Sequence, residues 1–108
     1  KWGRRLYDRL KALGFRSLYP VNPREECIGS DRCYPSVSSL PGKPDLVITV
    51  TRPEVTEKVA EECTSLGVPM LWMQPGSESA KAKTTCRKAG MMCSAGSCYV
   101  TDGLGESW

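Results

Sequence analysis

Three short polar segments carry the residue types best suited to chemistry in this sequence: residues 21–24, 51–53 and 74–77. Each follows a stretch that predicts a strand, and each contains a proline that stiffens its loop. Arg24 and Arg52 add a cation to two of the segments. In open α/β sheets, ligands bind beyond the carboxyl ends of the strands, where the N–H groups of helix N-termini attract anions. The pattern predicts a site for a phosphate-bearing, nucleotide-like ligand.

The elements that must position these segments alternate between helix and strand. Leucines at helical spacing predict a first helix that ends at Gly14, and Pro53 opens a later helix with the stripe Val55, Val59, Cys63 and Leu66. A further helix is predicted over residues 77–89, and strands over residues 15–19, 45–50, 68–73 and from residue 91 onward. Such alternation implies βαβ crossovers, so we expect an α/β fold with three layers and an open parallel sheet.

Length and composition restrict the class of protein. The 108 residues fit one domain, which we place over residues 1–108, and 40% apolar with 25% charged residues is an ordinary globular composition. The absence of histidine excludes Ser-His-Asp and Cys-His relays and imidazole metal ligands. No apolar run approaches the ~18–20 residues of a membrane span, and charged residues interrupt any secretory signal at the start. These features favour the cytoplasm.

The distribution of charge is more informative than its sum. A net charge of +3 is too small to indicate a nucleic-acid partner. Residues 1–24 nevertheless hold seven basic residues against one acid, Asp8. Such a segment suits either phosphate groups or the exposed face of a helix, and the exposed face is the favoured interpretation for Arg5, Arg9 and Lys11.

The six cysteines are interpreted mainly as buried thiols. There is no C-x-x-C pair, so the spacing argues against structural zinc, and we predict no metal ligands. Cys63 continues a helical stripe, and residues 91–93, two methionines and a cysteine, form an apolar run that we expect in the core. Cys27 and Cys33 share a loop and could form a disulfide, although a reducing compartment favours free thiols.

Structural roles compete with ligand binding at several positions. Ser77 is expected to cap the helix that follows it, and Trp72 to pack between helix and sheet rather than stack on an adenine. Asn22 could brace its own turn through its amide. For Pro53 and Pro75, a role in a turn or at a helix start is equally open.

A series of motifs occurs in a recognisable order along nearly the whole chain. They are Lys1-x-Gly3-x-Arg5, Tyr19-Pro20-Val21-Asn22-Pro23, Cys33-Tyr34-Pro35-Ser36, Asp45-Leu46-Val47-Ile48, Arg52-Pro53, Trp72-Met73-Gln74-Pro75-Gly76, Ala89-Gly90 and Cys98. This order resembles that of the small stand-alone CoA-binding domain proteins, which are similar to the CoA-binding domain of the succinyl-CoA synthetase alpha subunit. The resemblance implies a Rossmann-like fold that holds coenzyme A, or an acyl-CoA, at the strand ends.

The resemblance also assigns residues to the cofactor site. Carried over by position, the segment flanking the adenosine is Asn22, Pro23 and Arg24. The opposite side is lined by Thr51, Arg52 and Pro53, and the third wall by Gln74 and Gly76. Lys1 falls near the diphosphate. In proteins of this kind a strand and a glycine-rich loop precede the segment that matches Lys1, so we expect the sequence to lack both and to carry only part of the site.

Three functions follow as hypotheses. The first is non-catalytic binding of CoA or an acyl-CoA, with a nucleotide-like small molecule as partner and with neither nucleic acid nor a membrane as a partner. The second is an NAD(P)-binding domain or small oxidoreductase; an acidic residue at the end of the second strand would bind the ribose, and Glu25 lies near that place beside Asn22 and Arg24. The third is a thiol-based redox or regulatory protein that uses Cys98.

Overall fold

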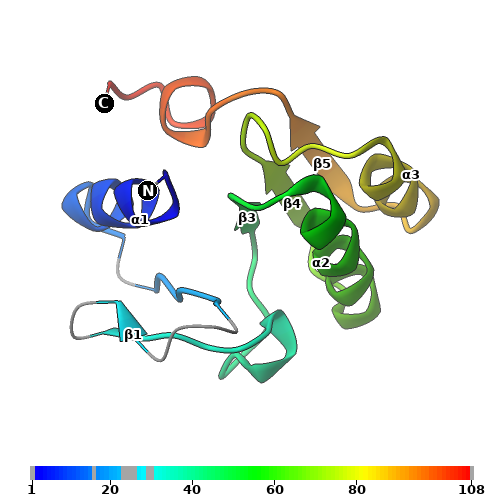
Figure 1. Cartoon of the computed structure of the whole chain (residues 1–108), viewed down its shortest axis with the longest axis horizontal. Helices are drawn as coiled ribbons and strands as arrows, with labels where there is room; N and C mark the ends of the chain where they lie inside the picture. The colour runs from blue at the N-terminus through cyan, green and yellow to red at the C-terminus, as the bar shows by residue number, and fades with distance from the viewer. Residues whose placement is uncertain (1, 16, 23–26, 29–30, 108) are drawn as a thin grey trace. The chain divides into compact units, whose positions relative to one another are not determined.

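The computed structural model describes residues 2–15, 17–22, 27–28 and 31–107 (Figure 1). The chain divides into two compact units, Lys1–Pro41 and Gly42–Trp108, and each is described by itself. None of the helices in the described part of the chain has both the length and the apolar character to span a lipid bilayer.

The first unit begins with helix α1, Trp2–Ala12, as the leucine spacing predicts. Leu6, Tyr7 and Leu10 form its buried face. Gly14 follows the helix with φ 97°, and its N–H donates to the Lys11 carbonyl. That left-handed conformation is easy for glycine and costly for other residues, which explains why the helix ends here.

The strand predicted over residues 15–19 is wrong for every described residue of that range. The backbone pairing falls later, in a single parallel bridge between Val21 and Tyr34. The Asn22 N–H donates to the Tyr34 carbonyl, and the Tyr34 N–H donates to the Pro20 carbonyl, both at 2.8 Å. These two bonds flank Val21 and form a bridge but not a ladder, so the segment is extended without being a strand.

A small hairpin that the sequence did not predict lies between the two residues of this bridge. Strands β1, Cys27–Ile28, and β2, Asp31–Arg32, pair antiparallel, and a short 3-10 helix, η1, spans Val37–Ser39. Strands of two residues have no detectable alternation of apolar and polar side chains, so pattern analysis cannot find them.

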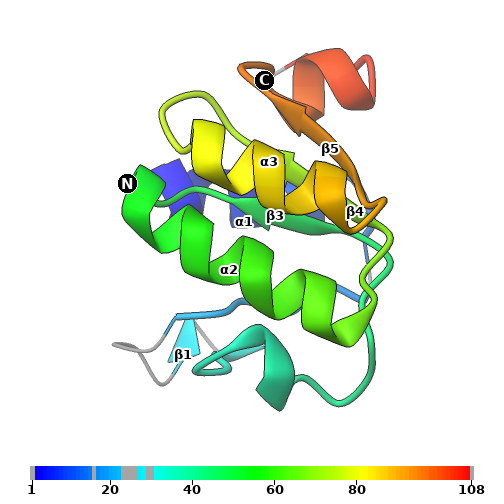
Figure 2. The same cartoon turned by 90° about the vertical axis from the view of Figure 1, so that its right-hand side faces the viewer.

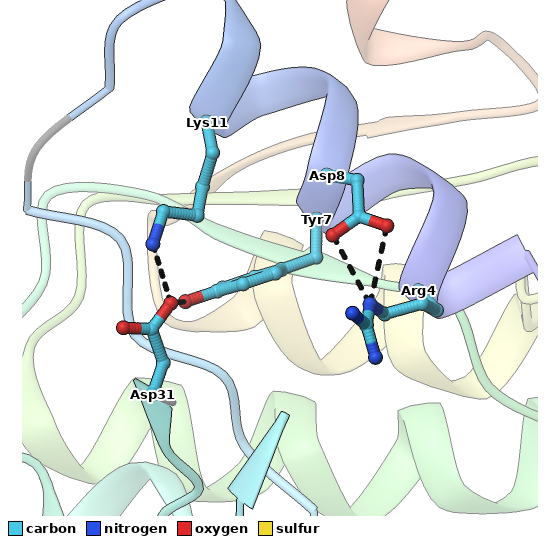
Figure 3. Close-up of polar contacts among 5 residues, drawn as sticks. All are labelled: Arg4, Tyr7, Asp8, Lys11 and Asp31. Carbon is cyan, nitrogen blue, oxygen red and sulfur yellow. Dashed lines mark hydrogen bonds and ion pairs between the residues drawn. The ribbon is translucent and has the colours of Figure 1, made fainter. Parts of the chain in front are cut away.

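One carboxylate joins this hairpin to helix α1 (Figure 3). Asp31 accepts a hydrogen bond from the Tyr7 hydroxyl and one from the Lys11 ammonium group, both at 2.5 Å. The pairing with Lys11 and with Tyr7 lowers the pKa of Asp31, whereas burial and Asp31 raise that of Tyr7. Lys11 is exposed, as the sequence suggests, but it also forms an ion pair with Asp31 of the hairpin.

The second unit contains a parallel sheet of three strands in the order β3-β4-β5. Its strands are β3, Val47–Thr49, β4, Met70–Met73, and β5, Met92–Ala95. Helices α2, Pro53–Leu66, and α3, Ala80–Lys88, connect them and lie side by side on one face of the sheet (Figures 1 and 2). The α/β class and the parallel sheet are confirmed, with β3 and β4 shorter than predicted.

Helix α2 turns a different face to the core than the sequence predicts. Its buried residues are Thr56, Ala60 and Cys63, while Val55 and Leu66 are exposed. The predicted stripe is therefore right for Cys63 and wrong for Val55 and Leu66. The small side chain of Ala60 lets the helix pack closely. The Thr56 hydroxyl can be buried because it bonds the Thr51 hydroxyl at 2.7 Å.

The chain end contributes a further element to this unit. A turn of π-helix, η2, spans Tyr99–Gly103. Trp72 donates its indole N–H to the Ser97 carbonyl at 2.7 Å and meets the Tyr99 ring edge-on at 5.2 Å. Trp72 is thus buried, as predicted, but its partners belong to the chain that follows β5.

The apolar run at residues 91–93 is only partly in the core. Met91 is buried, but Met92 is 67% exposed and Cys93 is exposed too, so the prediction of a core position is wrong for both. The reason is the place of β5 at an edge of the described sheet, where only one neighbouring strand covers its residues.

The C-terminal cap of α2 gives a direct test of this local structure. Gly67 has φ 75°, so Gly67→Ala places a Cβ in the left-handed region and should cost about 1 kcal/mol of unfolding free energy. Gly42 lies outside that region with open space around it, so Gly42→Ala should be neutral or slightly stabilising. Thermal unfolding followed by circular dichroism compares the two variants; equal melting temperatures would contradict the assignment.

From the lowered pKa of Asp31 we expect the stability of the first unit to fall in acid. Because its folded-state pKa lies below the usual 3.8, its contribution to stability is present above pH 4 and is lost as pH falls through the folded pKa. The free energy of unfolding, measured with urea, should therefore fall more steeply between pH 5 and pH 2 for the wild type than for Asp31→Asn. Tyr7→Phe should lose part of the same effect, and Asp8→Asn, which breaks only the exposed Arg4–Asp8 pair, should resemble wild type. If the free energy of unfolding depends on pH identically in the wild type and in Asp31→Asn, the contacts of Asp31 with Tyr7 and Lys11 do not stabilise the first unit.

Candidate functional site

The carboxyl ends of β3, β4 and β5 meet at one edge of the sheet in the second unit. Three connecting segments start there: residues 50–52 lead into α2, residues 74–79 lead into α3, and residues 96–98 lead into η2. This is the edge at which open α/β sheets bind ligands, because parallel strands all end there and helices begin there.

The segment after β3 presents a cation at the start of a helix. Arg52 is the N-cap residue of α2 and its side chain is exposed, while Pro53 occupies the first helical position. The N–H groups of Val55 and Thr56 both donate to the Arg52 carbonyl. A cation beside the positive end of a helix dipole is unfavourable by itself. Glu54 in the first turn offsets part of this charge, and an anionic ligand would offset more.

The segment after β4 is fixed by buried hydroxyl groups. The Ser77 hydroxyl lies 2.9 Å from that of Thr49 and donates to the Gln74 carbonyl at 2.8 Å. Ser77 therefore locks the loop onto β3 and does not cap α3, so the predicted cap is wrong. The cap is Ser79, whose hydroxyl oxygen accepts the Ala82 N–H at 3.3 Å and also donates to Glu57 of α2 at 2.7 Å.

A backbone amide in this loop already holds an anion of the chain itself. Gly76 has φ 92°, and its N–H donates to the Glu78 carboxylate at 2.8 Å. The carboxylate is a charged acceptor, so the bond is stronger than one between neutral groups. The amide thus lies where a carboxylate, or another anion in its place, can bind.

The side chain of Gln74 joins this loop to the chain after β5. Gln74 is 4% exposed, and its Oε1 accepts the Tyr99 N–H at 2.6 Å while its Nε2 donates to the Cys98 sulfur at 3.5 Å. Both ends of the amide are used within the protein. Gln74 shapes the edge of the sheet by holding other residues, and this limits what its amide can offer to a ligand.

Cys98 is held at the same edge by its backbone as well. Its N–H donates to the Asp102 carboxylate at 3.0 Å, and its carbonyl accepts the Asp102 N–H at 2.8 Å. These bonds form the first turn of η2 and leave the thiol half-buried. The motif order pointed to Cys98, but no sequence signal indicated its contact with Gln74, because the two residues are 24 positions apart.

The predicted site residues fall into three groups. Thr51, Arg52, Pro53, Gln74 and Gly76 come together at the strand ends of the second unit. Asn22 lies in the first unit, where its backbone bonds Tyr34. The remaining predicted residues, Lys1, Pro23 and Arg24, lie outside the described residues.

Sequence reasoning missed two residues that shape this edge. Glu78, which occupies the Gly76 amide, had no distinguishing spacing. Ser79 could have been found from its position, because a serine immediately before Ala80-Lys81-Ala82 is as good a cap signal as Ser77.

Comparisons with known proteins agree with this architecture. Among characterised proteins, the acetate–CoA ligase [ADP-forming] II subunit alpha of Pyrococcus furiosus is 35% identical over 68 residues, which are 63% of this chain but 15% of that protein. The chain thus spans a small fraction of that relative. A conserved hypothetical protein from Pyrococcus furiosus has a solved structure with TM-score 0.85 and 38% identity, covering 91% of this chain and 84% of that one.

A second solved structure and a family model complete the comparison. A hypothetical protein from Pyrococcus horikoshii matches with TM-score 0.83 and 28% identity, over 88% of this chain and 66% of that one. The model of the CoA binding domain family matches residues 1–103, nearly the whole sequence. The parallel sheet, its strand-end loops and this match lead to one conclusion: the chain belongs to the CoA binding domain family.

Proposed function

We propose that this protein binds coenzyme A or an acyl-CoA at the carboxyl ends of β3 and β4, without catalysing a reaction on it. The observation that carries the proposal is the exposed Arg52 at the N-terminus of α2, in a chain whose family is defined by CoA binding. CoA bears a diphosphate and a 3′-phosphate, and a guanidinium group beside a helix N-terminus suits such anions.

The other predicted residues extend the proposed site. Thr51 and Pro53 flank Arg52, and Gly76 offers an amide from the neighbouring loop. The resemblance to CoA-binding proteins also assigns Asn22, Pro23 and Arg24 to the adenosine and Lys1 to the diphosphate. Gln74 acts as a positioning residue, because its amide holds Cys98 and Tyr99 in place.

Binding without catalysis is favoured by the residue types available. The sequence has no histidine, so neither a Ser-His nor a Cys-His pair can form. The ligase subunit it resembles is far longer, and the matched part covers 15% of it. We therefore do not extend the ligase reaction to this chain.

Arg52 provides the principal test. Isothermal titration of the full chain with CoA should give saturable heat, and Arg52→Gln should weaken binding about tenfold, equivalent to about 1.4 kcal/mol. The matched control is Arg87→Gln, which changes another exposed arginine, in the last turn of α3, and should bind as wild type does. Binding should also weaken with added salt, because the contacts are between charges at the surface.

Two results would contradict the proposal. One is the absence of heat at millimolar CoA from a protein whose circular dichroism shows it to be folded. The other is tighter binding of NADH than of CoA, measured by the fluorescence of the nicotinamide; this would favour the dinucleotide hypothesis instead. An equal loss of affinity in Arg52→Gln and Arg87→Gln would keep CoA binding but move it away from the strand ends.

Glu78 should compete with the ligand for the Gly76 amide. Glu78→Gln removes a negative charge from the edge that would receive the phosphates, so affinity for CoA should increase about three- to tenfold at low salt. Glu61→Gln, which removes the same charge from an exposed position within α2, should change affinity little. The same titration measures both variants; unchanged or weaker binding by Glu78→Gln would show that the ligand does not approach Gly76.

A further inference from the structure

Helices α2 and α3 carry opposite charges on the same face of the second unit. Helix α2 holds four glutamates and one lysine, whereas α3 holds three lysines, one arginine and no acidic residue. Figure 2 shows the two helices side by side in front of the sheet. An acidic surface therefore adjoins a basic one within a single unit of the chain.

Four of these charged side chains form two strips that are open to solvent. The acidic strip consists of Glu54 and Glu61 of α2, and the basic strip consists of Lys81 and Lys88 of α3; all four residues are exposed. Among the residues that the structure describes, none of these four has an ion-pair partner. Their charges are therefore available to another molecule, and a molecule that fits the whole face has to offer both signs of charge.

The two strips match each other in length and direction. The two residues of each strip are seven positions apart, which is about two helical turns, or roughly 10 Å along the axis. The helices run in the same direction, because each connects two parallel strands of one sheet. A two-fold axis parallel to the helices therefore stacks α2 of one copy on α3 of a second copy. Glu54 then lies opposite Lys81 of the second copy, and Glu61 lies opposite Lys88 of the second copy.

The remaining charges on this face favour the same arrangement. Lys58, which is exposed between the two glutamates of α2, falls opposite Thr84 of the second copy, an exposed neutral residue. A two-fold axis across the helices would instead stack α3 on α3 and bring four basic residues against four. Like charges facing one another weaken an interface, so the distribution of charge selects the stacking of α2 on α3.

We propose that two copies of this chain associate through this face, with the acidic strip of each copy against the basic strip of the other. A second copy is the occupant because the face complements itself: a two-fold interface uses the same patch twice, so every pairing of opposite charges occurs twice. Exposed ion pairs are individually weak, so the dimer forms at high protein concentration and is sensitive to salt. This association does not require CoA.

Sedimentation velocity of the full chain, from about 10 µM to about 1 mM protein, measures the association. At low salt the weight-average mass should increase with concentration from that of one chain toward that of two. In about 1 M NaCl, where the Debye length is about 3 Å, the dissociation constant should be at least about tenfold higher. A chain that stays monomeric at about 1 mM in low salt would overturn the proposal.

Charge reversal identifies the surface that is used. Glu61→Lys and Lys88→Glu should each weaken the dimer at least about tenfold, because each variant places like charges opposite one another at two positions. An equimolar mixture of the two variants should dimerise again, since their heterodimer has opposite charges at both positions. The double variant Glu61→Lys/Lys88→Glu should likewise dimerise as wild type does.

A control variant and the mixture separate this surface from any other. Glu106→Lys makes the same change of charge at an exposed position outside both helices, and it should associate as wild type does. If Glu61→Lys and Lys88→Glu dimerise as well as Glu106→Lys does, the copies meet elsewhere and the proposal is wrong. It is equally wrong if the two variants, folded by circular dichroism, stay monomeric when they are mixed, because the two strips then do not face each other.

Discussion

The carboxyl edge of the sheet depends on the hydrogen bonds of one buried glutamine. The Gln74 N–H donates to the Thr49 carbonyl at the end of β3, its carbonyl accepts two bonds from Ser77, and its side chain binds Tyr99 and Cys98 beyond β5. One residue thus joins the ends of all three strands. A buried amide is costly unless both of its ends are paired, and here both are. Any ligand at this edge meets loops whose separation Gln74 has already set.

The polar groups at this edge differ in what they leave for a ligand. The hydroxyls of Thr49, Thr56 and Ser77 are buried and bonded within the protein, so they give the loops their shape. Arg52 is exposed at the positive end of α2, and the Gly76 amide is paired with the carboxylate of Glu78 in its own loop. An anion is therefore the ligand class that would bind best at this edge. It would offset the positive charge of Arg52 beside the helix N-terminus and could replace the Glu78 carboxylate at the Gly76 amide.

The sequence predicted well where a backbone rule decides the structure. Pro53 and Gly67 begin and end α2, and the apolar run around Ile48 becomes a parallel strand. Side-chain burial was less predictable. The buried face of α2 includes Thr56, because Thr51 supplies a hydrogen bond from outside the helix, and no count of apolar residues contains that information. Met92 is exposed for a similar reason: its hydropathy is that of a core residue, but β5 lies at an edge.

The candidate site was harder to predict than the fold because it depends on contacts between distant residues. Motif order identified Arg52, Gln74, Gly76 and Cys98, yet it could not distinguish a residue that touches a ligand from one that positions others. The structure makes that distinction for Gln74, whose amide is occupied by Tyr99 and Cys98. The same distinction applies to Cys98, whose sulfur accepts a hydrogen bond from the Gln74 amide and so helps to shape the strand ends.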